Sequence, residues 1–346
     1  MKTLETERLI LRKYAQDDFD AVHSYASSVE NTIYMPFGPN TEEQTHEFLD
    51  RSIKTTEENL VNGYIFAIVL KETGKLIGGC EISPSGNKAI GDEASLGWII
   101  HRDYWKQGYG TEMGKELLRF GFEELNLHRI TANCDAENYG SYRAMERIGM
   151  RREGTFFENR PPNKLTDKKY SDGFLYAILK DEWETQKEMA YYNSLPVVFD
   201  DFIDVPELSD GLIYLVCTEK HPANPEKKHV PGYNFMICKN GEKIGALSLR
   251  IGYTDGLYFG GQIGYNIDEK YRGNGYAGRA CRLILPVAKA HGMIKLLITN
   301  DHKNAASKRV CEKLGARFIR VARLPEWNDL YQSGGRFENI FEWSIK

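Results

Sequence analysis

The feature that most constrains the fold is an internal repeat, in which the second half of the 346-residue chain follows the first at a constant distance. The segments TGKLIGG (73–79), LGWII (96–100) and KQGYG (106–110) match NGEKIGA, IGYNI and GNGYA, each 167 residues later. One residue is then lost, and NYGSYRAMERIGM (138–150) matches NAASKRVCEKLGA (304–316). This period is far longer than the roughly 20–50 residues of solenoid repeats. We therefore interpret it as a duplicated domain.

The two copies differ at their starts. The first copy has helical patterns before its first long apolar run, including TEEQTHEFLDRSIKTTEENL (41–60), whereas the second has little helical pattern before GLIYLVCTE (211–219). The segment ETQKEMAYYNSLP (184–196) is charged and then turn-like, which indicates the end of a helix and a linker. We expect an N-terminal domain at 1–190 and a C-terminal domain at 191–346 whose N-terminal region is shortened.

Composition excludes several classes of protein. Hydrophobic residues make up 41% and charged residues 27% of the chain, as in globular proteins, and the net charge of −4 gives no basic surface for nucleic acid. The six cysteines are scattered and the eight histidines show no metal-ligand spacing, so we expect neither a metal site nor a disulfide framework. No apolar run reaches about 18 residues and no signal sequence is evident. We expect a reduced, cytoplasmic protein that binds no membrane, and the sequence leaves its oligomeric state open.

The order of elements predicts an α/β fold in each copy. Antiparallel strand patterns come first, and a strand–helix–strand crossover follows, which is typical of a mixed sheet with flanking helices. In the first copy we expect a hairpin over 64–83, a strand at 94–101, a helix at 111–125, a strand at 129–135, a short helix at 140–149 and a strand at 173–183. The second copy repeats this order, with its first helix at 278–291.

A glycine-rich loop stands between a strand and a helix in both copies, at QGYG and GNGYA. Backbone N–H groups at such a helix start form an anion site, and glycine lets a phosphate approach closely. The loop is not a P-loop, because Tyr109 takes the place of the first glycine and Glu116 the place of the magnesium-binding Ser/Thr. A dinucleotide-binding GxGxxG motif also fails, since Met113 replaces its last glycine.

These motifs together resemble the GCN5-related N-acetyltransferase (GNAT) family, in which such a loop binds the pyrophosphate of coenzyme A. The first copy resembles the ribosomal-protein N-acetyltransferase branch through ETERLILR (5–12), YWKQGYGTEM (104–113) and N-x-x-S-x-R-x-M-E-x-x-G-M (138–150). It departs from the general loop in having Trp105 where Gln or Arg usually stands. The second copy carries the general form from Arg272 to Ala277. The resemblance covers most of both copies.

The resemblance implies two tandem GNAT-like domains, each with a mixed, mostly antiparallel sheet that splays apart where acetyl-CoA binds. The pantetheine arm would pair with one strand like an added strand, and the phosphates would bind at the glycine loop. In the first copy the implied cofactor residues are Trp98, Ile99, Ile100, Lys106, Gln107, Gly108, Gly110, Thr111 and Asn138. In the second copy they are Tyr265, Asn266, Ile267, Arg272, Asn274, Gly275, Ala277, Gly278 and Asn304.

The catalytic residues follow the family pattern less closely. Relatives often have a Glu two residues before the strand glycine, where this chain has Ser95 and Gln262. Glu93 lies two residues further back on the same strand face and is our candidate general base. Relatives also often have a Tyr seven residues after the Asn, where this chain has Met145 and Cys311. In the branch that the first copy resembles, the serine of N-x-x-S is the candidate acid, here Ser141. The alternative for Glu93 is that it is only an exposed carboxylate at the end of a loop. The alternative for Ser141 is that it is only a residue in the first turn of a helix.

We therefore expect an acetyl-CoA-dependent N-acetyltransferase that transfers the acetyl group directly to a primary amine, with its main active site in the first copy. The acceptor would be a small molecule or a protein N-terminus. The alternative is a catalytically silent acyl-CoA-binding or scaffold protein, or one live and one structural domain. The second copy has neither the Glu nor the Tyr, so it would bind the cofactor without catalysis or use Tyr265.

Overall fold

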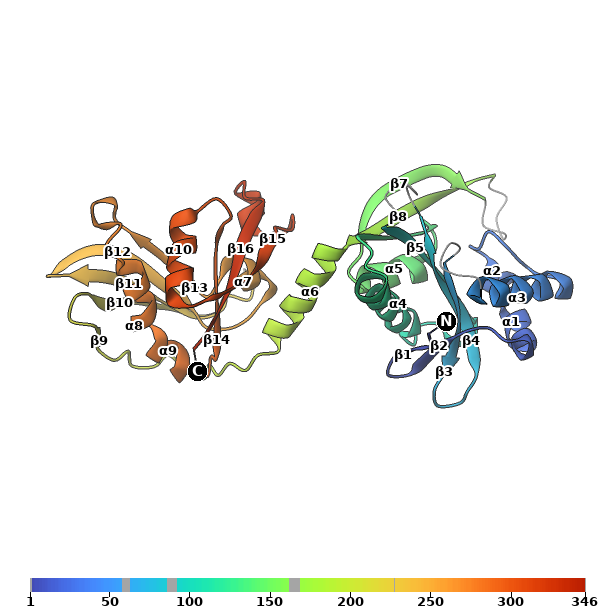
Figure 1. The fold of residues 1–346 in the computed structure, drawn as a ribbon, viewed down its shortest axis with the longest axis horizontal. Helices are drawn as coiled ribbons and strands as arrows, with labels where there is room; N and C mark the ends of the chain where they lie inside the picture. Colours follow the sequence, from blue (N-terminus) through green and yellow to red (C-terminus); the bar gives the residue numbers. More distant parts are fainter. Residues whose placement is uncertain (1, 58–62, 86–91, 162–168, 227, 346) are drawn as a thin grey trace. The chain divides into compact units, whose positions relative to one another are not determined.

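The computed structural model of the chain describes all residues except 1, 58–62, 86–91, 162–168, 227 and 346 (Figure 1). The chain divides into two compact units, Met1–Trp183 and Glu184–Lys346. The division falls within helix α6 (Lys180–Asn193), which also contains the boundary expected after residue 190. Each unit has its own main hydrophobic core.

The first unit is built on an eight-stranded sheet with the order β1-β2-β3-β4-β5-β6-β8-β7. Neighbouring strands are antiparallel except β5 and β6, which are parallel. The expected mixed, mostly antiparallel sheet is therefore confirmed. The strands are β1 (Leu4–Glu5), β2 (Leu9–Arg12), β3 (Tyr64–Leu70), β4 (Leu76–Pro84), β5 (Glu93–Ile100), β6 (Arg129–Asp135), β7 (Arg151–Arg160) and β8 (Ser171–Leu179).

Helices cover both faces of this sheet, which explains why β3 is apolar along its whole length. Phe66 and Ile68 lie in the main core with residues of α4, whereas Ala67 between them packs with residues of α1 and α3. In Figure 1, α4 and α5 lie on one side of the sheet and α1–α3 on the other. The helices are α1 (Phe19–Ala26), α2 (Val29–Thr32), α3 (Glu42–Glu57), α4 (Tyr109–Arg119) and α5 (Tyr139–Arg147).

The helix expected at 111–125 differs from the prediction at its end. It is α-helical only to Arg119 and continues as a π-helical turn, η4 (Phe120–Glu124). Gly121 fits this turn because a Cβ there would lie 2.6 Å from Ile130 Cδ1, which is closer than packed atoms approach. Phe120 and Phe122 are buried core residues, as predicted.

The sheet opens between β5 and β6. Their parallel pairing runs from Glu93 opposite Arg129 to Leu96 opposite Ala132 and ends there in the described part of the chain. The second half of β5 therefore leaves its backbone groups on that side without a neighbouring strand. This splayed geometry agrees with the one that the family resemblance implies.

In the second unit the same opening divides the sheet completely. One sheet has the order β13-β12-β11-β10-β9, and the other has the order β14-β16-β15. The strands are β9 (Leu208–Ser209), β10 (Tyr214–His221), β11 (Gly232–Lys239), β12 (Glu242–Arg250), β13 (Ile263–Ile267), β14 (Lys295–Asp301), β15 (Arg317–Arg323) and β16 (Phe337–Ser344).

Short helices pack on the second unit's sheets. The expected helix at 278–291 is wrong in detail, since it forms two helices, α8 (Tyr276–Leu283) and α9 (Leu285–Ala290). Pro286 stands in the first turn of α9, where a missing backbone N–H is tolerated but would interrupt a continuous helix. The remaining helices are α7 (Asp255–Gly260), α10 (Ala305–Leu314) and α11 (Asp329–Gln332).

The second unit has no counterpart of α1–α3 at its start. Between Asn193 and Asp255 the described residues form strands β9–β12 and no helix. Ser248, Arg250 and Gly264, which lie on one face of β12 and β13, are therefore only half-buried. The described elements agree with a shorter N-terminal region in the second unit, which stays a prediction.

Candidate functional site

The two glycine loops have the same backbone conformation. Gly108 and Gly275 each precede the first residue of a helix with positive φ, 84° and 75°, and Lys106 and Gly273 at the matching earlier position also have positive φ, 60° and 81°. Positive φ favours glycine, which explains three of these four residues. The repeated left-handed turns direct backbone N–H groups outward at the start of α4 and α8, and this geometry suits an anion.

Trp105 and Arg272 make the same contact despite their different chemistry. Trp105 Nε1 donates a hydrogen bond of 2.7 Å to the carbonyl of Ile100, and Arg272 Nε donates one of 3.0 Å to the carbonyl of Ile267. Both acceptors are the last residue of the strand before the loop. The departure at Trp105 therefore preserves the anchor that joins the loop to the strand end.

An ion pair holds the first turn of the helix that follows each glycine loop. The residue on the helix is acidic in the first unit and basic in the second. In the first unit, Glu112 on α4 pairs with Arg8 at 2.7 Å, and Arg8 also donates to the carbonyl of Gln107. In the second unit the matching helix residue is Arg279, which pairs with Asp210 at 2.7 Å. Both pairs tie the loop helix to the strand region near the start of its unit.

In the first unit the loop, the strand end and α5 converge. A Cβ at Gly110 would lie 3.7 Å from Ile100 Cδ1 and 3.9 Å from the Cβ of Ala144 on α5. Asn138 caps α5, because its Oδ1 accepts the Ser141 N–H at 3.1 Å. The predicted cofactor residues of the first unit therefore lie on three elements that meet: β5, the start of α4 and the start of α5.

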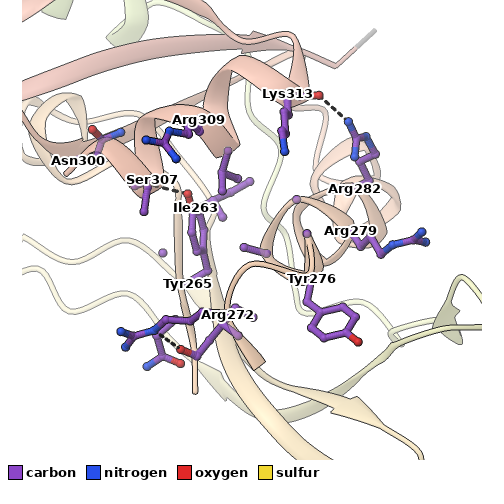
Figure 2. Close-up of a pocket in the computed structure, with 18 of the residues that line it drawn as sticks. Ile263, Tyr265, Arg272, Tyr276, Arg279, Arg282, Asn300, Ser307, Arg309 and Lys313 are labelled. Atoms are coloured by element: carbon purple, nitrogen blue, oxygen red, sulfur yellow. Dashed lines mark hydrogen bonds between the residues drawn. The ribbon is translucent and has the colours of Figure 1, made fainter. Parts of the chain in front are cut away.

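In the second unit all of the predicted cofactor residues line one cavity of about 1320 Å³. The cavity lies between β13, the loop, α8 and α10, and Figure 2 shows several basic side chains around it. Asn304 caps α10 by accepting the Ser307 N–H at 3.0 Å. The basic side chains that line the cavity are Arg250, Arg272, Arg279, Arg282, Arg309 and Lys313.

Two hydroxyl groups face each other in this cavity. Tyr265 Oη lies 2.9 Å from Ser307 Oγ, and Figure 2 shows the two side chains directed toward one another. Burial raises the pKa of Tyr265, so its phenol stays protonated at neutral pH. The first unit has Trp98 at the position that matches Tyr265.

The two catalytic candidates of the first unit lie in different places. Glu93 begins β5, and its Oε1 lies 3.3 Å from Nε of Arg129, which also pairs with Glu153. The loop begins after the other end of this strand, about 24 Å away at 3.4 Å per residue. Ser141 lies in the first turn of α5 beside Cys134, whose thiol has its pKa raised to about 11 by burial.

Glu81 is a candidate that sequence reasoning missed. It stands on β4 directly opposite Gly97, and a Cβ at Gly97 would lie 3.0 Å from Glu81 Oε1. Although the residue reaches solvent, burial by the surrounding protein raises the pKa of Glu81, and the nearby charge of Arg51 opposes this shift. The sequence LIGGCEISP of β4 indicates this candidate, because Glu81 is the one charged residue in an otherwise uncharged strand.

In the second unit the equivalent positions carry no carboxylate. Ser248 stands opposite Gly264, where Glu81 stands opposite Gly97. Gln262, which occupies the family's Glu position, is fully buried and joins the two sheets. Its Oε1 accepts the Leu297 N–H at 2.6 Å, and its Nε2 donates to the carbonyl of Gly252 at 3.0 Å. Its side chain is therefore structural.

The described part of the chain contains neither a metal cluster nor a membrane-spanning helix. No cluster of His, Cys, Asp and Glu there has the arrangement of a metal site. None of the described helices combines the length and the apolar character that crossing a bilayer requires.

Comparison with known proteins identifies the family. The model of the acetyltransferase (GNAT) domain matches residues 8–151 and 215–317, which together exceed half of the chain. The chain therefore belongs to the GNAT acetyltransferase family. The two matched segments correspond to the two copies of the internal repeat.

Two relatives with sequence similarity each match about half of this chain over nearly their whole length. The uncharacterized N-acetyltransferase YnaD of Bacillus subtilis is 35% identical over 52% of this chain and 98% of its own length. The uncharacterized N-acetyltransferase p20 of Bacillus licheniformis is 31% identical over 53% of this chain and 99% of its own length. A solved GNAT-family acetyltransferase from Bacillus anthracis is 33% identical, covers 52% of this chain and 99% of its own, and superposes with a TM-score of 0.46.

Proposed function

We propose that the chain is an acetyl-CoA-dependent N-acetyltransferase that transfers an acetyl group directly to a primary amine. The domains would be 1–190 and 191–346, with the main active site in the first. The observation that carries this assignment is Glu81, whose carboxylate lies against Gly97 on the strand that leads to the glycine loop. The second unit has Ser248 at the matching position.

The residues present fit coenzyme A in both units. The backbone N–H groups at Gly108–Thr111 and Gly275–Gly278 would bind its pyrophosphate, because both loops carry the positive-φ turns that expose these donors. The second halves of β5 and β13 would bind the pantetheine arm, since their backbone groups face the opening of the sheet. When bound, acetyl-CoA supplies an acetyl group activated as a thioester.

Glu81 is the proposed general base of the first unit. A primary amine is protonated at neutral pH, and its lone pair attacks only after the proton leaves. A carboxylate with a raised pKa accepts this proton more readily than an ordinary one. We assign the base to Glu81 in preference to Glu93, because Arg129 forms an ion pair with Glu93 at the opposite end of β5.

Ser141 is the proposed proton donor on the leaving-group side. Its backbone position is fixed by the cap from Asn138 at the start of α5, a helix that packs against α4. A hydroxyl there would protonate the departing thiolate, either directly or through water, to give the free thiol of coenzyme A. All six cysteines are free thiols and five are buried, which supports a reducing, cytoplasmic location.

The acceptor would be a cationic amine on a small molecule or at a protein N-terminus. Glu81 places negative charge beside the strand glycine, and this charge attracts an ammonium group. Helices α1–α3 lie on the same side, since the charge of Arg51 on α3 reaches Glu81. They would form one wall of the acceptor site.

Calorimetric titration with acetyl-CoA tests the proposal. We expect two sites per wild-type chain, and one site in either Gly110→Trp or Ala277→Trp. A Trp at position 110 would collide with Ile100 and Ala144, and Ala277 is a buried residue of the second loop helix. If the wild type binds no acetyl-CoA, the proposal fails. If it binds acetyl-CoA but transfers no acetyl group to any of a panel of amines, the chain is a silent binding protein.

A further inference from the structure

Arg250 stands at a distinctive place in the cavity of the second unit. It lies on β12 two residues beyond Ser248, so both side chains are on one face of the sheet, and Ser248 is directly opposite Gly264. A Cβ at Gly264 would lie 3.6 Å and 3.7 Å from the two terminal guanidinium nitrogens of Arg250. The guanidinium therefore lies beside the strand glycine, within contact distance of where a Cβ would stand.

This guanidinium has few partners within the protein. Among the described residues it donates one hydrogen bond, of 3.2 Å to the carbonyl of Gly261, and it forms no ion pair with a carboxylate. Burial lowers the pKa of Arg250, although the group remains charged at neutral pH. A guanidinium carries five N–H donors, and a half-buried charge without a counterion is costly. Arg250 is one of the residues that line the cavity.

The first unit has the opposite charge at this place. Glu81 occupies the position of Ser248, and Ser83 occupies the position of Arg250. The strand glycine therefore faces a carboxylate in one unit and a guanidinium in the other. A reversal of charge at equivalent points of two cavities indicates acceptors of different charge.

We propose that Arg250 binds a carboxylate on the acceptor of the second unit, so that this unit takes an amino acid or peptide with a free carboxyl group. The proposal rests on the proposed function, because it treats the cavity as an acetyl-transfer site. Arg250 lies near the first residues of β13, and the phosphate-binding loop follows the last. Gly264 and Ile267 are about 10 Å apart along an extended strand. The anion beside Arg250 is therefore distinct from the pyrophosphate.

A matched pair of ligands tests this subsite on the full chain. N-acetylglycine carries the carboxylate, and N-acetylglycinamide has the same shape without the charge. Each is titrated calorimetrically with saturating coenzyme A into the Gly110→Trp variant, so that binding reports on the second unit. We expect the acid to bind about ten- to hundredfold tighter than the amide, as for a charge-assisted hydrogen bond.

Variants at Arg250 assign the preference to this residue. Arg250→Met should abolish the preference for the acid, and Arg250→Lys should retain part of it. Arg323→Met, which removes an exposed charge of β15, should leave it unchanged. Thermal unfolding of each variant verifies that it is folded. If Arg250→Met is not folded, the test uses Arg250→Lys in its place.

Each remaining outcome is decisive. If the Gly110→Trp variant binds coenzyme A and then binds N-acetylglycine and N-acetylglycinamide equally well, the carboxylate subsite is overturned. The proposed function is left standing by this result. A tenfold loss of coenzyme A affinity in Arg250→Met would show that Arg250 binds a cofactor phosphate, which also overturns it. Absence of coenzyme A binding by the wild type rejects the proposed function and the subsite together.

Discussion

At the residue scale, Gly97 and Gly264 are glycines for the same reason. Each leaves space for a polar side chain from the neighbouring strand, with Glu81 Oε1 3.0 Å and Ser248 Oγ 2.9 Å from the position of a Cβ. A larger residue would displace that side chain from the strand. The glycine of LGWII and IGYNI, visible in the repeat, therefore marks where each unit holds a polar side chain from the neighbouring strand.

Replacing Glu81 tests the proposed base. We expect Glu81→Gln to lower kcat/KM for a cationic amine about a hundredfold, because it removes the proton acceptor. In the wild type, kcat/KM should rise as pH increases through the raised pKa of Glu81, since only the ionised carboxylate accepts a proton. This rise of kcat/KM with pH should be absent from Glu81→Gln. Thiol release measured across pH gives both results.

Glu93→Gln is the matched control on the neighbouring strand. Its carboxylate is paired with Arg129, so we expect at most a severalfold change in kcat/KM. A hundredfold loss in Glu93→Gln with little effect in Glu81→Gln would return the role of base to Glu93.

At the element scale, the strand ends decide how each sheet opens. In the first unit a short parallel ladder joins β5 to β6, whereas in the second the backbone N–H of Gln262 and its side-chain amide together make the bonds to Leu297. Among the described residues, the second half of β5 therefore has no strand paired with it on the side of β6, and the second half of β13 has none on the side of β14. The opening thus survives in the second unit although the ladder is lost.

The pairing of β14 with β16 makes the free energy of unfolding of the second unit depend on pH. Glu338 lies directly opposite Asp301 and is 7% exposed, and burial with repulsion from Asp301 raises its pKa from 4.5 to about 7. The folded state therefore binds this proton more tightly than the unfolded state. The resulting stabilisation is fully present below pH 4.5 and is lost as pH rises through 7.

Glu338→Gln should remove this dependence. The free energy of unfolding should match the wild type near pH 4.5 and exceed it by up to about 3 kcal/mol at pH 8. Urea unfolding of both proteins at several pH values measures the difference. The exposed residue Glu326 supplies the control, since Glu326→Gln should show no such gap. An equal gap at all pH values would contradict the assignment to Glu338.

At the scale of the whole molecule, one fold is used twice with different surroundings. The loops, caps and openings are repeated, as Gly108 with Gly275 and Asn138 with Asn304 illustrate. The helices α1–α3 and the charge beside the strand glycine are not repeated. This pattern is expected if both units bind one cofactor and differ in acceptor.

The loop variants test whether the two units act separately. We expect Gly110→Trp to abolish acetyl transfer to cationic amines, because it blocks the unit that contains Glu81. Ala277→Trp should leave this rate within twofold of the wild type. Initial rates of thiol release with a diamine give the comparison. Equal loss in both variants would show that the units do not act separately.

Part of the site was predictable because its signals are local. A glycine with positive φ before a helix, an Asn cap and a strand glycine each depend on a few neighbouring residues, and the repeat showed that they recur together. The equivalence of Trp105 and Arg272 was not predictable, since two unlike side chains reach the same carbonyl. The break between α8 and α9 was predictable from Pro286 and was missed.

The sequence by itself determined the duplication, the α/β class, the glycine loops and the family. Only the tertiary structure decided which charged group faces the strand glycine in each unit. Glu81 lies directly opposite Gly97 in the register of β4 and β5. Arg250 reaches Gly264 from two residues beyond Ser248, which is the direct partner of that glycine. A shift of one residue in that register would turn each side chain to the other face of the sheet. The register depends on pairing and packing between distant segments, so no local pattern reveals it.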